Sequence, residues 1–213
     1  MQTHFWSSLL IATTNAGKVQ EIRRVLDGLP VRLLTLSDVP APPEPAETGA
    51  TFADNALIKA RAYAYATRLP TVAEDSGLAI DALGGRPGIH SARYPGESYV
   101  EKFDNLYREL APHPEPWTAR FVCALAFIAP DAAPDSDDRA ADFACEGVVH
   151  GEITRDPRGT NGFGYDPIFF HPPSGRTTGE LTVAEKLALS HRGAAFRTFR
   201  TWAEEGWKAA SGR

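Results

Sequence analysis

Short apolar runs and amphipathic stretches alternate along the chain. Residues 9–13 (LLIAT) are a continuous apolar run that ends in polar residues, which predicts a buried strand. Residues 19–26 then carry apolar side chains on one helical face and predict a helix. A further strand is expected at residues 31–36, before a Pro-rich surface connection over residues 39–49. Strands that alternate with helices favour the α/β fold class, with some neighbouring strands paired as antiparallel hairpins.

Capping residues predict where the later helices begin. In a capping box, a Ser or Thr and an acidic residue three positions later bond each other's backbone N–H groups. Pairs of this kind are Thr51 with Asp54, Ser98 with Glu101, and Thr182 with Glu185. The first pair opens a helix expected over residues 53–69, and Ser190 is expected to cap a last helix that continues to the C-terminal end.

The second half of the chain contains two long strand-like runs, residues 119–129 and 142–153. The acidic, Pro-containing segment between them, residues 130–140, is expected to be a solvated insertion without function. Residues 159–170 (GTNGFGYDPIFF) predict a glycine-rich turn that runs into another apolar strand.

Residues 71–81 (TVAEDSGLAID) are unusual because two apolar pieces flank Glu74, Asp75, Ser76 and Gly77. Open α/β sheets bind ligands just outside their strand ends, so we expect the strand to end at these polar residues. Adjacent carboxylates point to opposite sides of an extended chain. One of them could hold Mg²⁺ and the other could polarise or deprotonate a water molecule. The alternative is a polar turn between two strands.

Composition narrows the class of ligand. Of the 213 residues, 43% are hydrophobic and 23% are charged, an ordinary globular composition. The formal net charge of −5 argues against binding to nucleic acid or an acidic membrane through bulk charge, so an anionic ligand needs a local cluster of cations and backbone amides. Cys123 and Cys145 lie in apolar runs and are expected to be buried free thiols. Because we find neither a signal-peptide pattern nor an apolar run of about 20 residues, we expect a cytoplasmic protein.

Residues 13–18 (TTNAGK) lie between the first predicted strand and helix, where free backbone amides can bind phosphate. Thr13 and Asn15 could add hydrogen bonds, and Lys18 a positive charge. A plain Asn cap with a solvent-facing lysine is the alternative reading of the same residues.

The segment GFGYDP could surround a flat ligand. Its glycines allow close approach of the backbone, Phe163 offers a stacking face, and Asp166 could accept hydrogen bonds from ring N–H groups. A glycine hairpin with a core aromatic residue would have the same sequence.

The segment SHR places His191 and Arg192 in the first turn of the last predicted helix. Cations are unfavourable there unless an acceptor such as a purine carbonyl or a phosphate lies opposite. Lys186, one turn upstream, could share that pocket. The alternative is that all these basic side chains are solvated.

Taken in order, these segments form a family pattern. The motif T-x-N-x-x-K, the helix with Asn55 and Lys59, and the segments EDSGLAIDALGGRPGIHSARY, GTNGFGYDPIFF and ELTVAEKLALSHR closely resemble the inosine triphosphate pyrophosphatase (Ham1-like) family. The resemblance extends from about Leu10 to Phe199. It implies one domain over residues 1–213, with two lobes that share a central mixed twisted sheet, flanking helices and a cleft between the lobes.

The resemblance also implies a reaction, the Mg²⁺-dependent hydrolysis of ITP, dITP and XTP to the monophosphate and pyrophosphate. It implies a homodimer as well. A pyrophosphatase of broader base specificity and a non-catalytic nucleotide sensor are the alternatives.

Site residues follow from the same resemblance. The triphosphate is expected at Thr13, Thr14, Asn15, Ala16, Gly17, Lys18 and Lys59, and Ser76 should touch the substrate. The base pocket is expected at Phe163, Gly164, Tyr165, Asp166, Lys186, His191 and Arg192, whose last two members would donate to a purine 6-oxo group. Asp75 is expected to serve the metal and the attacking water, with Glu74 as the alternative base. Glu47 is expected to be the second metal ligand, with Glu44 as the alternative.

Overall fold

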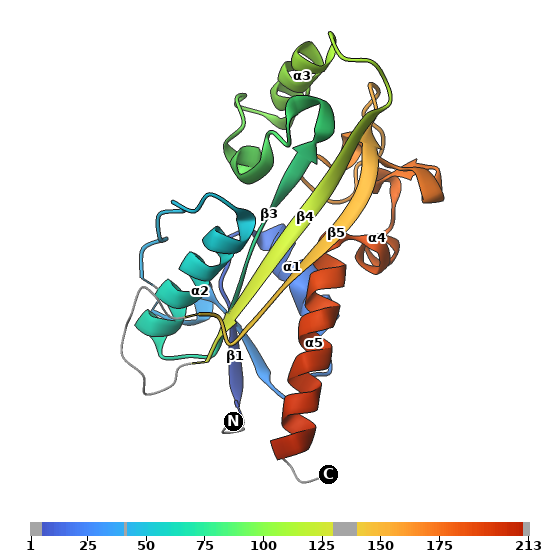
Figure 1. Cartoon of the computed structure of the whole chain (residues 1–213). Helices are drawn as coiled ribbons and strands as arrows, with labels where there is room; N and C mark the ends of the chain where they lie inside the picture. The colour runs from blue at the N-terminus through green and yellow to red at the C-terminus, as the bar shows by residue number, and fades with distance from the viewer. Residues whose placement is uncertain (1–5, 41, 130–139, 211–213) are drawn as a thin grey trace.

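A mixed β-sheet organises the chain. The computed structural model describes residues 6–40, 42–129 and 140–210. The seven strands of the sheet are β1 (Ser8–Ile11), β2 (Arg32–Thr35), β3 (Thr71–Ile80), β4 (Trp117–Ile128), β5 (Phe143–Ile153), β6 (Phe169–His171) and β7 (Arg176–Thr177). Their order in space is β2-β1-β3-β4-β5-β6-β7 (Figure 1). Strand β1 runs parallel to β2 and β3, and the other neighbours are antiparallel, which confirms the predicted α/β class with a mixed sheet.

The helices begin where the capping residues predict. They are α1 (Ala16–Leu26), α2 (Phe52–Thr67), α3 (Tyr99–Leu110), α4 (Val183–Leu189) and α5 (His191–Ala210). The hydroxyl oxygens of Thr51, Ser98, Thr182 and Ser190 each accept the backbone N–H three residues later, at 3.0 to 3.3 Å. A short 3-10 helix, η3 (Gly88–Arg93), lies in the connection between β3 and α3.

Strand β3 contradicts the expectation that the strand ends at EDSG, and also the alternative of a polar turn between two strands. It runs without interruption from Thr71 to Ile80, because β4 pairs with it along its whole length. Strand β1 is much shorter, and of the residues of β3 it pairs only with Thr71 and Val72. The polar residues therefore lie within β3 but just beyond the carboxyl end of its parallel neighbour β1, which is where open α/β sheets bind ligands.

Apolar side chains of the central strands alternate between the two faces of the sheet. Leu125 and Phe127 of β4 pack with α1 and α5 on one face, and Ala124 and Ala126 pack with α2 on the other. This alternation is the period of two that a strand buried on both faces requires.

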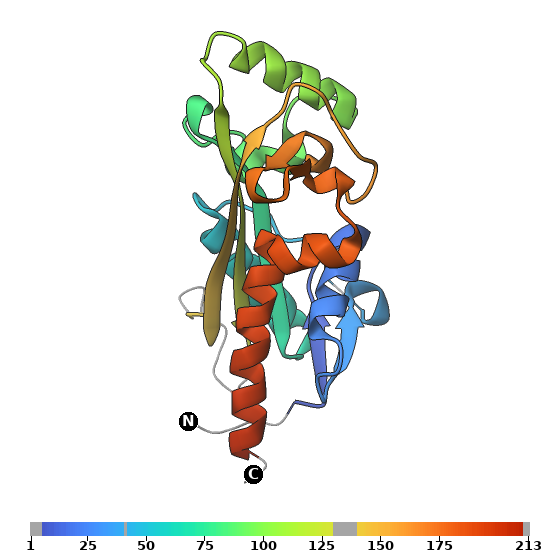
Figure 2. The same ribbon diagram turned by 90° about the vertical axis from the view of Figure 1, so that its right-hand side faces the viewer.

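A third apolar cluster lies at the other end of β3, β4 and β5. It joins Leu78 and Ile80 to Leu106 of α3 and to Phe169 of β6. We call this end, with η3, α3, β6 and β7, the upper lobe; the lower lobe consists of β1, β2, α1, α2 and α5. Figures 1 and 2 show the three long strands running through both lobes. The residues of EDSG lie where the apolar clusters meet, and so they do not interrupt any one of them.

Other expectations have mixed outcomes. Residues 42–49 contain neither helix nor strand, as predicted for the Pro-rich connection, whereas residues 130–139 lie outside the described residues. Cys123 and Cys145 are free thiols; Cys123 is buried, but Cys145 is partly exposed, contrary to the prediction. None of the described helices is both long and apolar enough to cross a membrane.

Candidate active site

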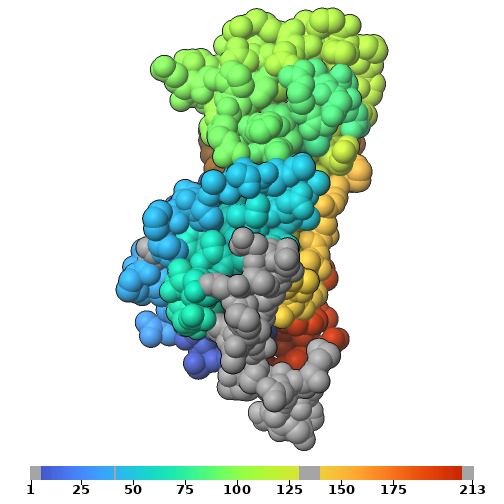
Figure 3. Space-filling model, turned by 60° about the vertical axis from the view of Figure 1, so that its left-hand side comes forward, coloured from blue at the N-terminus to red at the C-terminus, as the bar shows by residue number. Residues whose placement is uncertain are grey.

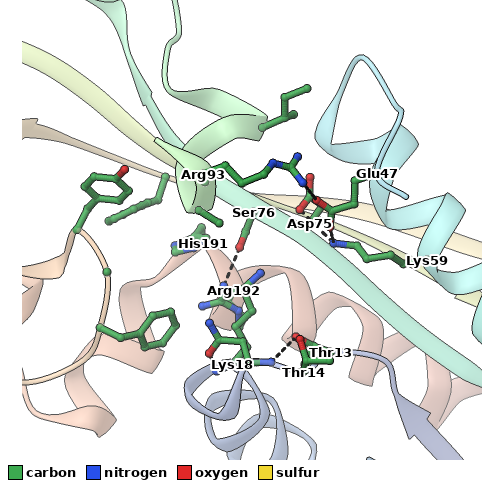
Figure 4. Close-up of a pocket in the computed structure, with 18 of the residues that line it drawn as sticks. Thr13, Thr14, Lys18, Glu47, Lys59, Asp75, Ser76, Arg93, His191 and Arg192 are labelled. Atoms are coloured by element: carbon green, nitrogen blue, oxygen red, sulfur yellow. Dashed lines mark hydrogen bonds and ion pairs between the residues drawn. The ribbon is translucent and has the colours of Figure 1, made fainter. Parts of the chain in front are cut away.

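A cavity of about 300 Å³ opens between the two lobes (Figure 4). Most of the predicted site residues line it. They are Thr13, Thr14, Asn15, Lys18, Glu44, Glu47, Lys59, Asp75, Ser76, Phe163, Gly164, Tyr165, Asp166, Lys186, His191 and Arg192. The predicted residues Ala16, Gly17 and Glu74 do not line it.

The segment TTNAGK, which the sequence predicts to bind phosphate, leads from β1 into the start of α1. Strand β1 ends at Ile11, and Asn15 caps the helix through its side-chain oxygen, which accepts the N–H of Lys18 at 3.1 Å. Thr13 in turn accepts the N–H of Asn15 at 3.2 Å, which fixes the loop. The helix N-terminus and the Lys18 side chain therefore face the same cavity, an arrangement that favours anions.

Glu74 and Asp75 point to opposite sides of β3, as the extended chain requires. On one side, Glu74 is paired with Lys18 at 2.7 Å and lies 3.6 Å from Arg192. Burial alone would raise the pKa of Glu74, but Lys18 and Arg192 outweigh it and hold this pKa far below its usual range. Glu74 is thus a buried, permanently ionised counter-charge for two cations.

On the other side, Asp75 faces α2. Its carboxylate accepts Lys59 Nζ at 3.1 Å and Asn55 Nδ2 at 3.2 Å, while Asn55 Oδ1 accepts the Gly49 N–H at 2.8 Å. Burial raises the pKa of Asp75, Lys59 opposes that rise, and the Glu47 carboxylate adds to it. Asp75 therefore holds a proton more readily than an ordinary aspartate, which suits a residue that accepts a proton from water.

Two carboxylates converge near Lys59. Its Nζ lies 2.6 Å from Glu47 Oε1 and 3.1 Å from Asp75 Oδ1, and burial would lower the pKa of Lys59 if Asp75, Glu74 and Glu47 did not raise it. No group of three or more His, Cys, Asp or Glu side chains in the described residues could hold a metal by itself. Asp75 and Glu47 match the small carboxylate set that Mg²⁺ uses together with substrate phosphates. Glu44, the alternative ligand expected from the sequence, also lines the cavity.

The other end of the cavity is built around Phe163 and Asp166. Asp166 Oδ2 accepts the Phe163 N–H at 2.7 Å and Lys186 Nζ at 2.5 Å, while Oδ1 accepts Thr178 at 2.8 Å. A side chain at Gly162 would place its Cβ 2.1 Å from Asp166 Oδ2, so glycine is needed there. Lys186 Nζ lies 4.6 Å from the centre of the Phe163 ring. Asp166 thus orders the turn that presents the Phe163 ring.

His191 and Arg192 begin α5 and are buried. The His191 ring stacks on Phe121 with centroids 4.9 Å apart. Burial lowers the pKa of His191 well below its ordinary value, with a further contribution from Arg192, so the imidazole is neutral at pH 7. Arg192 donates to Ser76 Oγ at 2.8 Å (Figure 4). One neutral ring and one permanent cation therefore lie side by side.

Sequence reasoning missed Glu21, a buried residue of α1. Its carboxylate accepts Arg192 at 2.6 Å and Lys186 at 2.8 Å, so it holds both cations of the Phe163 end in place. The signal available in the sequence was that Glu21 is one helical turn after Lys18 and therefore shares its face.

Arg93 of η3 was also missed. It lines the cavity from the upper lobe and pairs with Glu47 Oε2 at 3.3 Å. Figure 3 shows the green segment that contains η3 and α3 directly above the blue-to-cyan segment that leads into α2. Arg93 therefore spans the two lobes at the carboxylate end of the cavity.

Comparison with known proteins gives a consistent result. A model of the Ham1 family matches residues 9–202. The chain is 45% identical over 203 residues to a dITP/XTP pyrophosphatase of Geobacter sulfurreducens, covering 94% of this chain and 97% of the relative. It is 43% identical to a dITP/XTP pyrophosphatase of Escherichia coli K12, covering 89% and 94%. Its structure superposes on a HAM1 protein from Coxiella burnetii with a TM-score of 0.83 and 39% identity, over 93% of this chain and 98% of the other.

Proposed function

The chain belongs to the Ham1 family, and from this premise we propose that it is a nucleoside-triphosphate pyrophosphatase acting on deaminated purine nucleotides: dITP, ITP and XTP. The observation that carries the proposal is that the two ends of the cavity differ in chemical character. A helix N-terminus, Lys18 and Lys59 lie with Asp75 at one end, and the Phe163 ring lies with buried donors at the other. One end suits a triphosphate and the other suits a flat base.

The charges of the cavity support a requirement for a divalent cation. Among the described residues, five cations line the wall, and each is already paired with a carboxylate: Lys18, Lys59, Arg93, Lys186 and Arg192. A triphosphate adds several negative charges to a site with little uncompensated positive charge. We infer that Mg²⁺ binds with the substrate through Asp75 and Glu47. When bound, it supplies positive charge to the phosphate oxygens.

Hydrolysis requires one bond to form and one to break. The water oxygen bonds to the α-phosphorus while the bond from that phosphorus to the α,β-bridging oxygen breaks. The bridging oxygen leaves with its electron pair on pyrophosphate, and one water proton passes to Asp75 and then to solvent. Asn55 and Lys59 hold the Asp75 carboxylate in one orientation, and Lys18 binds the phosphates from α1.

Selectivity rests on the buried donors at the start of α5. Arg192 keeps its charge at all relevant pH values because its guanidinium lies beside Glu74 and Glu21, which raise its pKa despite the cost of burial. A 6-oxo purine can accept from this donor, whereas the 6-amino group of adenine cannot. An unpaired buried donor penalises the wrong base, which is how a site rejects a close analogue.

We further infer that residues 1–213 act as one catalytic unit and that two copies associate as a homodimer. The substrate cleft is shared by both lobes, and its residues come from segments between Thr13 and Arg192. Neither lobe would hold a complete site alone.

The experiment that tests the proposal measures pyrophosphate release from XTP in heavy-oxygen water. Release with Mg²⁺, none with EDTA, and heavy oxygen in the monophosphate are expected. Asp75→Asn should lower kcat by about 10²–10⁴-fold. Asp81→Asn is the matched control, because Asp81 is exposed and pairs with Arg120 away from the cavity. Tight binding of XTP without turnover by the unaltered chain would refute the proposal and indicate a sensor.

A further inference from the structure

Three cations lie at the carboxylate end of the cavity, and they differ in how firmly they are held. Lys59 contacts Glu47 and Asp75, and its side chain is only 9% exposed. Lys18 is 16% exposed and pairs with Glu74, which is 1% exposed. Moving either lysine would leave a buried carboxylate without its close partner, and an unpaired buried charge has a high free-energy cost.

Arg93 is different, because it can leave its partner without isolating a charge. Its side chain is 56% exposed, and the only ion pair that it forms with the described residues is the one with Glu47 Oε2, at 3.3 Å. Glu47 keeps Lys59 at 2.6 Å through its other oxygen. An ion pair with one member exposed to water contributes less to stability than a fully buried pair, so exchange of Glu47, which is 18% exposed, for another anion costs Arg93 little.

The backbone beside Arg93 is fixed, so only the side chain has to move. Ser91 Oγ accepts the Leu78 N–H of β3 at 2.9 Å and donates to Gly88 O at 2.6 Å. The Tyr165 hydroxyl donates to Ser91 O at 2.9 Å. A β-carbon at Gly77 would lie 2.4 Å from Ser91 Oγ, so only glycine allows η3 to pack this closely on β3. These contacts hold the base of the Arg93 side chain at the cavity wall.

We propose that Arg93 is a further catalytic residue, which leaves Glu47 to bind the terminal phosphates of the substrate and stays on the pyrophosphate as it departs. This inference rests on the proposed function of the cavity. As the bond between the α-phosphorus and the bridging oxygen breaks, negative charge accumulates on the pyrophosphate. A guanidinium binds phosphate oxygens through two parallel N–H donors and remains charged throughout. Because Arg93 comes from the upper lobe and the lysines come from the lower lobe, the phosphates are held from both sides.

The test compares Arg93→Ala with Arg86→Ala. Arg86 is a matched control, since it lies in the same connection, is 59% exposed and pairs with a glutamate, Glu109 at 2.6 Å, but does not line the cavity. Titration calorimetry with pyrophosphate and Mg²⁺ should show binding weakened by about tenfold or more in Arg93→Ala and unchanged in Arg86→Ala. With XTP, Arg93→Ala should lower kcat by about 100-fold. Inhibition by the monophosphate product should be unchanged, and Arg93→Lys should recover part of the pyrophosphate affinity.

Equal pyrophosphate affinity in the Arg93→Ala and Arg86→Ala variants would overturn the inference. So would a fall in kcat with unchanged pyrophosphate affinity, since Arg93 would then act by positioning Glu47. The calorimetric result does not require turnover. Failure of the inference is therefore distinguishable from failure of the proposed function, which would appear as no XTP hydrolysis by the unaltered chain.

Discussion

Burial determines how much the ion pairs of this protein contribute to stability, and Glu21 provides a direct test. Glu21 Oε2 lies 2.6 Å from Arg192, and Glu115 Oε1 lies the same 2.6 Å from Arg155. The Glu21 and Arg192 side chains are 7% and 2% exposed, whereas those of Glu115 and Arg155 are 54% and 57% exposed. Replacing either glutamate with glutamine removes one charge and preserves the shape of the side chain.

The structure gives the expected size of the effect for Glu21→Gln. Removing one partner from a buried ion pair costs about 3–5 kcal/mol. Both cations that Glu21 contacts keep a second carboxylate, since Lys186 retains Asp166 at 2.5 Å and Arg192 retains Glu74 at 3.6 Å. The loss should therefore be near the lower limit, about 3 kcal/mol of unfolding free energy. Glu115→Gln should cost less than about 1 kcal/mol.

Urea unfolding, monitored by tryptophan fluorescence, measures the loss of unfolding free energy in both variants. Trp207 of α5 is buried in the apolar cluster that α5 and α1 form with the sheet, and so it reports on the lower lobe. The slope of the unfolding free energy against urea concentration must be the same in the two variants for their free energies to be compared. A loss below about 1 kcal/mol for Glu21→Gln, equal to that for Glu115→Gln, would refute the argument that burial makes this network strong.

Three further predictions concern named side chains. Because burial depresses the folded-state pKa of His191, the unfolded chain binds its proton first, and stability should fall as the pH drops below the unfolded value of 6.5. His191→Gln should remove up to about 1.4 kcal/mol per pH unit of that fall, measured by urea unfolding from pH 7 to 5.5; identical slopes would contradict the assignment. Gly77→Ala should lower stability by about 1–3 kcal/mol, since its Cβ would lie 2.4 Å from Ser91 Oγ. Gly206→Ala, which meets nothing within 4 Å, is the control and should not destabilise. Arg192→Lys should lower kcat/KM for ITP more than kcat/KM for ATP, so that the ratio of the two values falls. An unchanged ratio would show that Arg192 does not determine selectivity.

The sequence predicted local features of this fold well. The helix starts at Thr51, Ser98, Thr182 and Ser190 depend on hydrogen bonds between residues three positions apart, and all four bonds are present. The continuous apolar run of residues 9–13 is likewise a property of residues that are neighbours in sequence. These signals survive because tertiary contacts reinforce them.

Residues with distant partners were harder to predict. Continuous pairing of β3 through EDSG depends on β4, which begins at Trp117, and no pattern within residues 71–81 reveals it. Glu21 contacts Arg192, 171 positions later. Arg93 approaches Glu47 only because Ser91 and Gly77 allow η3 to pack on β3. The catalytic and metal-binding roles of Asp75 and Glu47 stay predictions.

The measurement that tests the central claim most directly is pyrophosphate release from ITP, XTP, dITP, ATP and GTP, each with Mg²⁺ and with EDTA. Rapid Mg²⁺-dependent release from the first three, with little from ATP or GTP, is the predicted result; because guanine also carries a 6-oxo group, rejection of GTP must involve its 2-amino group. Release from none of them, or equal release from all five, would contradict the claim that this cleft hydrolyses deaminated purine nucleotides selectively.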